Sequence, residues 1–350
     1  MSMKTNLTAA ALALFLAACA HNPSDSIPLA AQGSFTVGGG YVTHPGTFKQ
    51  ENFIAPDGQR AYGDFAYVKY QAPTNAKPLP LIFQHGGAQS SRTWESTVDG
   101  REGFDTLFLR KGYSVYLLDQ PRSGKSNLST QAVTPDTPWA SNPMYGDKTL
   151  WLLSRMGHYD GNGKPVANAQ FPEGEAAYQA FQQAWTIGSG PLDNDLNADV
   201  LAQLVGKTDG AILVTHSMGG TIGWRTALRS DKVKAIVAWE PGGTPFIFPE
   251  NEMPKITQAR FAALSGAAMG VPMNEFLKLT KIPIVLYYGD YIQVGSENVG
   301  EDKWGTELAM AKQFVDTINR HGGDATLVHL PEIGIQGNSH FLWARKTINS

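Results

Sequence analysis

Ala211-Ile212-Leu213-Val214-Thr215-His216-Ser217-Met218-Gly219-Gly220 is the stretch that decides the fold. Its first five residues predict a buried strand, and residues 221–229 predict a helix directly after the glycines. A serine at such a strand–turn–helix corner presents its hydroxyl outward, as a nucleophile requires. The usual pattern is Gly-x-Ser-x-Gly, and Thr215 stands here in place of the first glycine. The alternative interpretation of Ser217 is an ordinary serine that caps a helix.

Short apolar runs alternate with helical patterns from about residue 65 onward. Most are rich in Val, Ile, Leu and Tyr and bounded by Gly or Pro, and they lie at residues 65–71, 79–83, 113–118, 211–215, 233–239, 282–288 and 325–330. Continuous apolar runs are typical of strands that are buried on both faces of a parallel sheet. Apolar residues at helical spacing, such as Met310, Phe314 and Ile318, lie between the runs. This order predicts an α/β fold with a mostly parallel central sheet flanked by helices.

One long stretch interrupts this alternation. Residues 128–171 contain many Pro, Gly and Asn residues but also several Trp, Tyr and Met residues. A loop of this length is usually functional or disordered, and its aromatic content argues against disorder. We interpret residues 128 to about 206 as a cap inserted after the fourth core strand, with Trp151, Met156 and Trp185 as candidate substrate-binding residues. The alternative is that these side chains pack onto the edge of the sheet.

A second glycine-rich turn follows an earlier strand. Residues 79–83 lead into Gln84-His85-Gly86-Gly87. Acyl transfer needs backbone N–H groups aimed at the developing oxyanion. One N–H comes from the residue after the nucleophile, Met218, and the other comes from a loop of this kind. We expect Gly87 or Gly86 to be this second donor, and His85 to support the loop.

The general base and its acidic partner are expected late in the chain, in the order Ser, acid, His. His340 follows the last predicted strand in a loop, whereas His329 lies within that strand, so His340 is the candidate base. Two carboxylates compete for the role of orienting acid. Glu240 follows the strand at 233–239, and Asp290 follows the strand at 282–288. Position alone leaves both open.

The chain resembles an exported branch of bacterial esterases of the α/β-hydrolase superfamily. Several stretches carry the resemblance: Arg92–Glu95, Asp99–Arg101, Phe108–Tyr113, Asp119-Gln120 with Gly124 and Ser126, Gln170–Pro172, His216-Ser217, Glu240–Gly242, Gly289-Asp290 and Gly337–His340. In this branch the acid is a glutamate after the sixth strand. The resemblance therefore implies a triad of Ser217, Glu240 and His340, with Asp290 as a structural acid. The chain departs from the branch where Met218 replaces a polar residue and where Gly87-Ala88 replaces adjacent cysteines.

The composition of the 350 residues excludes several classes of protein. Apolar residues make up 42% and charged residues 17%, so the chain can form a core and is not a disordered one. The net charge of −3, without a long basic run, points to no nucleic-acid partner. No histidine pair has zinc-site spacing, and Gly124-Lys125-Ser126 lacks the upstream glycine of a phosphate loop. We expect no metal and no cofactor.

The N-terminal residues predict export. Lys4, the apolar stretch 7–16 and Leu16-Ala17-Ala18-Cys19 are typical of a signal peptide. The last four residues also look like a bacterial lipobox, in which the only cysteine of the chain, Cys19, would carry lipid. The alternative is a plain signal peptide. We expect a signal peptide at 1–18, a lipidated tether at 19–34 and the hydrolase domain at 35–350, anchored to a bacterial membrane and facing the periplasm or the outside.

Together these features predict a serine esterase that acts on a small to medium hydrophobic ester through an acyl-enzyme. A lactonase, amidase or peptidase of the same fold is the nearest alternative. A binding lipoprotein that retains the fold without turnover is a further alternative. The natural ester and the oligomeric state are left open by the sequence.

Overall fold

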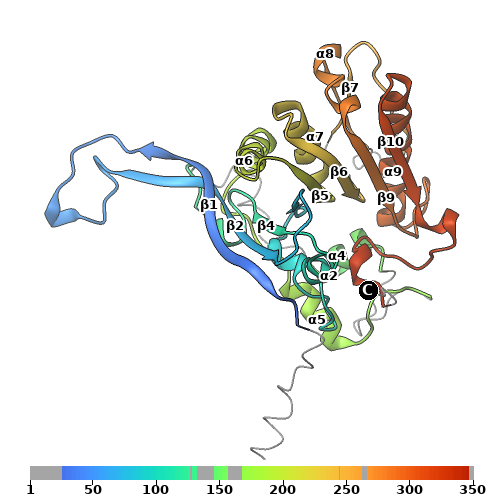
Figure 1. The fold of residues 1–350 in the computed structure, drawn as a ribbon, viewed down its shortest axis with the longest axis horizontal. Coiled ribbons are helices and arrows are strands. Elements are labelled where there is room, and N and C mark those ends of the chain that lie inside the picture. The colour runs from blue at the N-terminus through green and yellow to red at the C-terminus, as the bar shows by residue number, and fades with distance from the viewer. Residues whose placement is uncertain are drawn as a thin grey trace, which may run out of the picture.

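The computed structural model describes residues 26–126, 128–131, 146–156, 168–243, 245–261 and 266–346. Its centre is an eight-stranded sheet with the order β1-β2-β4-β3-β5-β6-β9-β10 (Figure 1). The strands are β1 (Leu29–Thr43), β2 (Arg60–Pro73), β3 (Leu81–Gln84), β4 (Val115–Asp119), β5 (Ala211–His216), β6 (Val233–Trp239), β9 (Pro283–Tyr288) and β10 (Asp324–His329). From β4 to β10 all neighbours are parallel, whereas the β1–β2 and β2–β4 pairs are antiparallel. The predicted α/β fold with a mostly parallel sheet is confirmed.

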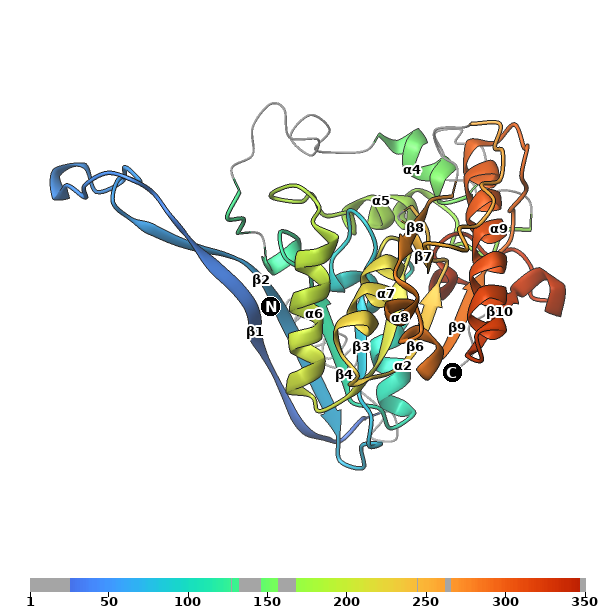
Figure 2. The same cartoon turned by 90° about the horizontal axis from the view of Figure 1, so that it is seen from above.

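Helices cover the sheet on both faces. They are α2 (Phe104–Arg110), α4 (Asp147–Leu153), α5 (Glu175–Gln183), α6 (Asn194–Lys207), α7 (Gly219–Arg229), α8 (Met273–Phe276) and α9 (Val299–Arg320). Buried side chains of α6, α7 and α9 share one core cluster, and those of α2, α4 and α5 share another. Figure 2 shows α6 and α7 side by side in front of the strands. The molecule therefore has three layers, because each helix buries one apolar stripe against the sheet.

Smaller elements complete the described part of the chain. Strands β7 (Phe246–Pro249) and β8 (Ala268–Val271) form a separate parallel pair, which the apolar pattern does not predict. Short 3₁₀ turns lie at Gln50–Asn52, Ser91–Trp94, Gly124–Ser126, Leu279–Lys281, Leu330–Ile333 and Leu342–Ala344. None of the helices in the described residues is long and apolar enough to cross a membrane.

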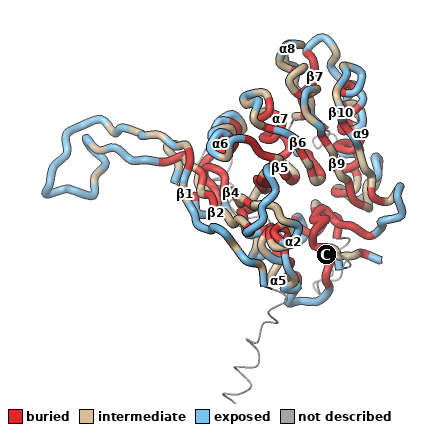
Figure 3. The backbone as a smooth tube through the Cα atoms, in the orientation of Figure 1, coloured by how far each residue is buried: buried red, intermediate tan, exposed pale blue. Residues whose placement is uncertain are grey.

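The first strand corrects the predicted boundary of the tether. β1 begins at Leu29 and pairs with β2 along its whole length, so residues 29–34 belong to the fold. These residues carry no strand-like apolar alternation, and their hydrogen bonds come from a strand far along the chain. Beyond the body, β1 and β2 continue as an arm whose end is exposed, including Phe53 and Ile54 (Figures 1 and 3). Cys19 and the expected signal peptide lie outside the described residues.

The predicted cap also ends too late. The last segment of the predicted cap is α6, and Asp193 is the N-cap of this helix. The Asp193 side chain accepts hydrogen bonds from the amides of Asp195 and Leu196. Leu201 and Leu204 of this helix are fully buried in the main core, beside α7. α6 is therefore a helix of the α/β layers, and the insertion ends before it. The sequence does not distinguish α6 from the insertion before it, because no change in composition separates the two segments.

Candidate active site

Ser217 lies at the sharp turn between β5 and α7. Its φ angle is +52°, which an L-residue adopts only when its surroundings hold it there. Its amide donates to Trp239 O at 3.0 Å, and its carbonyl accepts from the amide of Gly220 at 2.9 Å. A side chain at Gly220 would come within 2.6 Å of the Cβ of Pro241. The small residues after Ser217 are thus required for the close packing that exposes the serine.

Thr215 occupies the position where a glycine is usual, and the structure shows how the turn accommodates it. Thr215 is fully buried. Its Cγ2 lies 2.9 Å from the place that a Cβ of Gly223 would occupy. Gly223 is on α7, in the turn of helix that faces this strand. The threonine methyl group therefore takes the space that this glycine leaves free.

The candidate oxyanion donors are the amides of Gly87 and Met218, which line one pocket together with Ser217. The amide of Gly86 donates instead to the Oε1 of Gln89 at 3.1 Å. Neither of the two candidate amides donates to an acceptor within the described part of the chain. This geometry favours Gly87 over Gly86 as the second donor. A Cβ at Gly86 would also lie only 2.9 Å from the Cβ of Ser217.

His85, expected to support this loop, is fully buried beneath it. Its Nδ1–H donates to Gly86 O at 2.8 Å, and its Nε2 accepts from the amide of Gln120 at 3.4 Å. Burial lowers the pKa of His85, so the neutral ring is favoured. The histidine therefore links two loops at the carboxyl ends of the strands.

His340 meets Glu240 behind the pocket. The Nδ1–H of His340 donates to the Oε2 of Glu240 at 2.6 Å. Glu240 is fully buried just after β6, with φ at +43°. Its other oxygen, Oε1, accepts from the amide of Gly289 at 2.7 Å and from the guanidinium of Arg155. The bond to Nδ1 leaves the Nε2 of His340 as the nitrogen that can accept a proton.

Asp290, the competing acid, does not contact His340 by hydrogen bond. Its Oδ2 accepts from the amide of Gly337 at 2.8 Å, and its amide donates to Asn338 O at 3.0 Å. Both partners belong to the loop that carries His340. Asp290 thus shapes the histidine loop, while Glu240 orients the imidazole.

Two rings lie against the imidazole of His340. The ring of Trp304 is 4.1 Å away between centroids, and the ring of His216 is 4.3 Å away. Burial lowers the pKa of His340 well below its usual range, and the cations of Arg155 and Lys303 lower it further. The pKa of His216 is also lowered, mainly by burial and to a smaller extent by the nearby His340. The unprotonated form of His340 is therefore favoured, as a general base requires.

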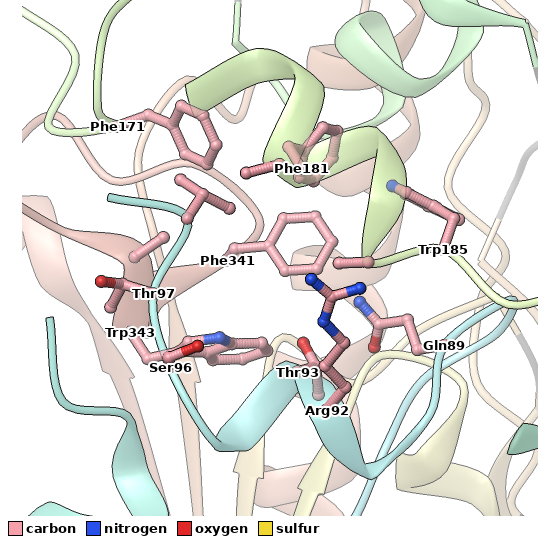
Figure 4. Close-up of a pocket in the computed structure, with 14 residues that line it drawn as sticks. Gln89, Arg92, Thr93, Ser96, Thr97, Phe171, Phe181, Trp185, Phe341 and Trp343 are labelled. Carbon is pink, nitrogen blue, oxygen red and sulfur yellow. The ribbon is translucent and has the colours of Figure 1, made fainter. Parts of the chain in front are cut away.

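The pocket in front of Ser217 has a volume of about 160 Å³. Its walls include Trp185, Trp304 and Phe341. A second pocket of about 70 Å³ shares the walls Gln89, Trp185 and Phe341 with the first. Figure 4 shows the second pocket, where the ring of Phe341 contacts the rings of both Phe181 and Trp185. Aromatic surfaces therefore line both the pocket at Ser217 and the pocket that adjoins it.

Only one of the three predicted substrate-binding residues lines these pockets. Trp185 does, whereas Trp151 and Met156 are fully buried. Trp151 packs its ring edge-on against Tyr178 of α5, at 5.0 Å between centroids. Trp151 of α4 and Met156, which follows this helix, belong instead to the core cluster that α2, α4 and α5 share. Neither lines either of these two pockets, so a role for them in substrate binding stays a prediction.

Three further residues contact the candidate site although no sequence pattern predicts them: Arg155, Trp304 and Gln89. Arg155 and Trp304 contact Glu240 and His340 from segments far away in the chain. No motif surrounds them, and the one available signal is an arginine in an otherwise apolar stretch after α4. Among the described residues, no group of three or more His, Cys, Asp or Glu side chains forms a metal-binding cluster.

Comparison with known proteins shows the family. The chain is 30% identical to a solved structure described as a novel bacterial esterase. The match covers 93% of this chain and 94% of the esterase chain, with a TM-score of 0.72. It is also 34% identical over 191 residues to a fungal protein (Fungal sp.) named probable secreted lipase phiG. That match spans 51% of this chain and 50% of the fungal protein. The model of the alpha/beta hydrolase family matches residues 81–333. By this match and by its fold, the chain belongs to the alpha/beta hydrolase family.

Proposed function

We propose that the chain is a serine esterase that cleaves carboxylic esters through an acyl-enzyme. The observation that carries the proposal is the hydrogen bond from His340 to Glu240, beside a pocket that Ser217 and His340 line together. A buried carboxylate, an imidazole held by its Nδ1 and a half-buried serine that lines a pocket are the three parts of an acyl-transfer site here. The likeness to proteins described as an esterase and a lipase supports ester chemistry.

In this mechanism the Nε2 of His340 removes the proton of Ser217 as the serine Oγ attacks the ester carbonyl carbon. The carbonyl oxygen becomes an oxyanion, which accepts hydrogen bonds from the amides of Gly87 and Met218. His340 then returns the proton to the alcohol oxygen as the carbon–oxygen bond breaks. The same imidazole deprotonates a water molecule, which attacks the acyl carbon. The proton then passes from His340 to Ser217 Oγ as the carbon–Oγ bond breaks and the carboxylic acid leaves. Glu240 holds the imidazole in the correct tautomer and stabilises its charged form.

The substrate that we propose is a small to medium hydrophobic ester. A dry apolar cavity of about 150 Å³ accepts a molecule the size of benzene. The pocket of about 160 Å³ beside Ser217 is similar in volume and is lined by aromatic rings. An acyl or alcohol group of roughly six non-hydrogen atoms therefore matches the space in front of the nucleophile.

The test is hydrolysis of p-nitrophenyl acetate, butyrate and octanoate, together with labelling by a fluorophosphonate. We expect turnover and labelling for the wild type and loss of both for Ser217→Ala. Ser230→Ala, at the far end of the same helix, is the matched control and should behave like the wild type. Labelling that persists in Ser217→Ala would refute the proposal. Cleavage of lactones or amides alongside inert esters would replace it with another acyl hydrolase.

We also propose that the protein is exported and anchored through lipid on Cys19. Leu16-Ala17-Ala18-Cys19 supports the anchor, and the fungal relative, which is named a secreted protein, supports export alone. Mass spectrometry of the membrane fraction should detect a mature N-terminus at Cys19 that carries acyl chains. A soluble product cleaved at another residue would contradict the anchor.

A further inference from the structure

Leu153, the last residue of α4, and the two residues after it contact the centre of the active site. Leu153 O accepts from the Nε1 of Trp304 at 2.8 Å, and Ser154 O accepts from the amide of His340 at 3.0 Å. The side chain of the third residue, Arg155, contacts Glu240. We call residues 153–155 the strap. It belongs to the insertion between β4 and β5, so an element outside the sheet contacts both Glu240 and the segment of His340.

Arg155 is the most constrained residue of the strap. Its side chain is 0% exposed, and its φ angle is +57°. Arginine is rarely buried to this extent unless it is paired. Its Nη2 donates to the Oε1 of Glu240, and its Nε donates to Asp290 O at 2.8 Å. The guanidinium therefore joins the ends of β6 and β9 through one rigid group.

Because of this contact, the two carboxylate oxygens of Glu240 have different hydrogen-bond partners. Oε1 accepts from Arg155 and from the amide of Gly289, which leaves Oε2 for His340. A carboxylate held by two donors on one oxygen cannot rotate away from the imidazole without breaking both bonds. A lysine in place of Arg155 would keep the charge but lacks the planar fork that reaches two acceptors at fixed angles.

The titratable and charged groups that face His340 come from four elements. Glu240 follows β6, His216 ends β5, Arg155 follows α4, and Lys303 lies on α9. The two cations both lower the pKa of His340, and they differ in their contacts. The Nζ of Lys303 lies 3.1 Å from Glu307 and 4.0 Å above the ring of Trp304. Lys303 thus has no contact with Glu240, whereas Arg155 also holds the carboxylate.

We propose that Arg155 is a positioning residue that locks Glu240 toward His340 and so makes the strap part of the active site, an inference that rests on the proposed esterase function. The insertion between β4 and β5 then does more than shape the pocket. Without Arg155, the acid and the base are each present but no longer held in the productive arrangement.

The test compares pH profiles of kcat/KM and kcat for four variants of the full chain. Arg155→Met should lower the high-pH plateau of kcat by roughly a hundredfold or more, because small misplacements of catalytic groups cost that much. It should also move the acid limb to higher pH, because a nearby cation no longer opposes protonation of His340. Arg155→Lys should retain the position of the acid limb but lose at least tenfold on the plateau.

Two further variants separate positioning from charge and from stability. Lys303→Met should move the acid limb upward and lower the plateau less than Arg155→Met does, because Lys303 does not contact Glu240. Arg122→Met breaks another buried ion pair, to Asp64 at 2.8 Å, and serves as the control for loss of stability. It should lower the urea midpoint without changing either part of the profile. Proton NMR adds a readout apart from activity, because the downfield Nδ1 proton of His340 should shift or broaden only in the Arg155 variants.

The outcomes are distinct. A folded Arg155→Met protein with wild-type plateau, acid limb and Nδ1 resonance would overturn the inference and leave the esterase proposal standing. A plateau loss no larger than that of Arg122→Met would also overturn it, as an effect of stability. A wild type that neither cleaves esters nor labels with fluorophosphonate would overturn the proposed function and this inference with it.

Discussion

The replacement of Glu240 by glutamine separates the two candidate acids. In the native site Oε2 accepts from His340, while Oε1 accepts from Arg155 and Gly289. A glutamine has one oxygen and one NH₂ group. If the NH₂ group takes the place of Oε1, it faces the N–H donors of Arg155 and Gly289 without an acceptor between them. The other orientation presents the NH₂ group to His340 and stabilises the wrong tautomer. Neither orientation reproduces the native hydrogen bonds.

The magnitude of the activity loss follows from this conflict. Amide replacement of the acid in a serine triad lowers kcat by about 10⁴, which corresponds to roughly 5 kcal/mol of transition-state stabilisation. The buried guanidinium of Arg155 also loses its counter-charge, which costs about 3–5 kcal/mol of stability. Combining Glu240→Gln with Arg155→Met should recover most of the stability and none of the activity, because the unpaired charge is then gone.

Asp290→Asn is the matched control, because within the described part of the chain this carboxylate accepts hydrogen bonds only from backbone amides. The asparagine side chain would retain one acceptor for the amide of Gly337 or Tyr291, at a cost of about 1–3 kcal/mol. We expect the kcat/KM of this variant for p-nitrophenyl butyrate to stay within about tenfold of the wild type. Both variants are checked by circular dichroism and urea unfolding. A larger loss for Asp290→Asn than for Glu240→Gln would refute the assignment of the acid.

Three further predictions concern the oxyanion loop, a buried carboxyl group and a helix cap. Gly86→Ala brings a methyl group to 2.9 Å from the Cβ of Ser217 and should lower kcat/KM about a hundredfold. The methyl group of Gly87→Ala meets only the flexible end of the Met218 side chain, at 3.4 Å, so this variant should retain kcat/KM within about tenfold of the wild type. Equal losses for the two variants in ester assays would contradict this prediction. Burial raises the pKa of Asp105 to about 6, so its native state binds a proton more tightly than its unfolded state and stability falls as pH rises from about 4 to 6. Asp105→Asn should therefore raise the free energy of unfolding by up to about 3 kcal/mol at pH 7.5 and change it little at pH 3.5, as urea titrations at both pH values would show. Asp193→Ala removes the cap of α6 and should cost about 1 kcal/mol in the same titrations, with no change in KM.

Local patterns determined much of the molecule. The strand at 211–215, the turn at Ser217 and the following helix are encoded within about twenty residues, and the structure shows them there. The long helix α9 was likewise predicted from Met310, Phe314 and Ile318, which are buried at helical spacing. Such elements can be read from sequence because side-chain periodicity and turn chemistry act between near neighbours in the chain.

The tertiary structure decided the rest. Position along the chain left Glu240 and Asp290 open, and only the packing of β6 beside β9 turns the first toward His340 and the second toward Gly337. The strand at Leu29 and the pairing of Arg155 with Glu240 also depend on segments that lie tens of residues apart. Contacts of this kind leave no local periodic signal, because their energy comes from burial and charge pairing that exist only after the chain has folded.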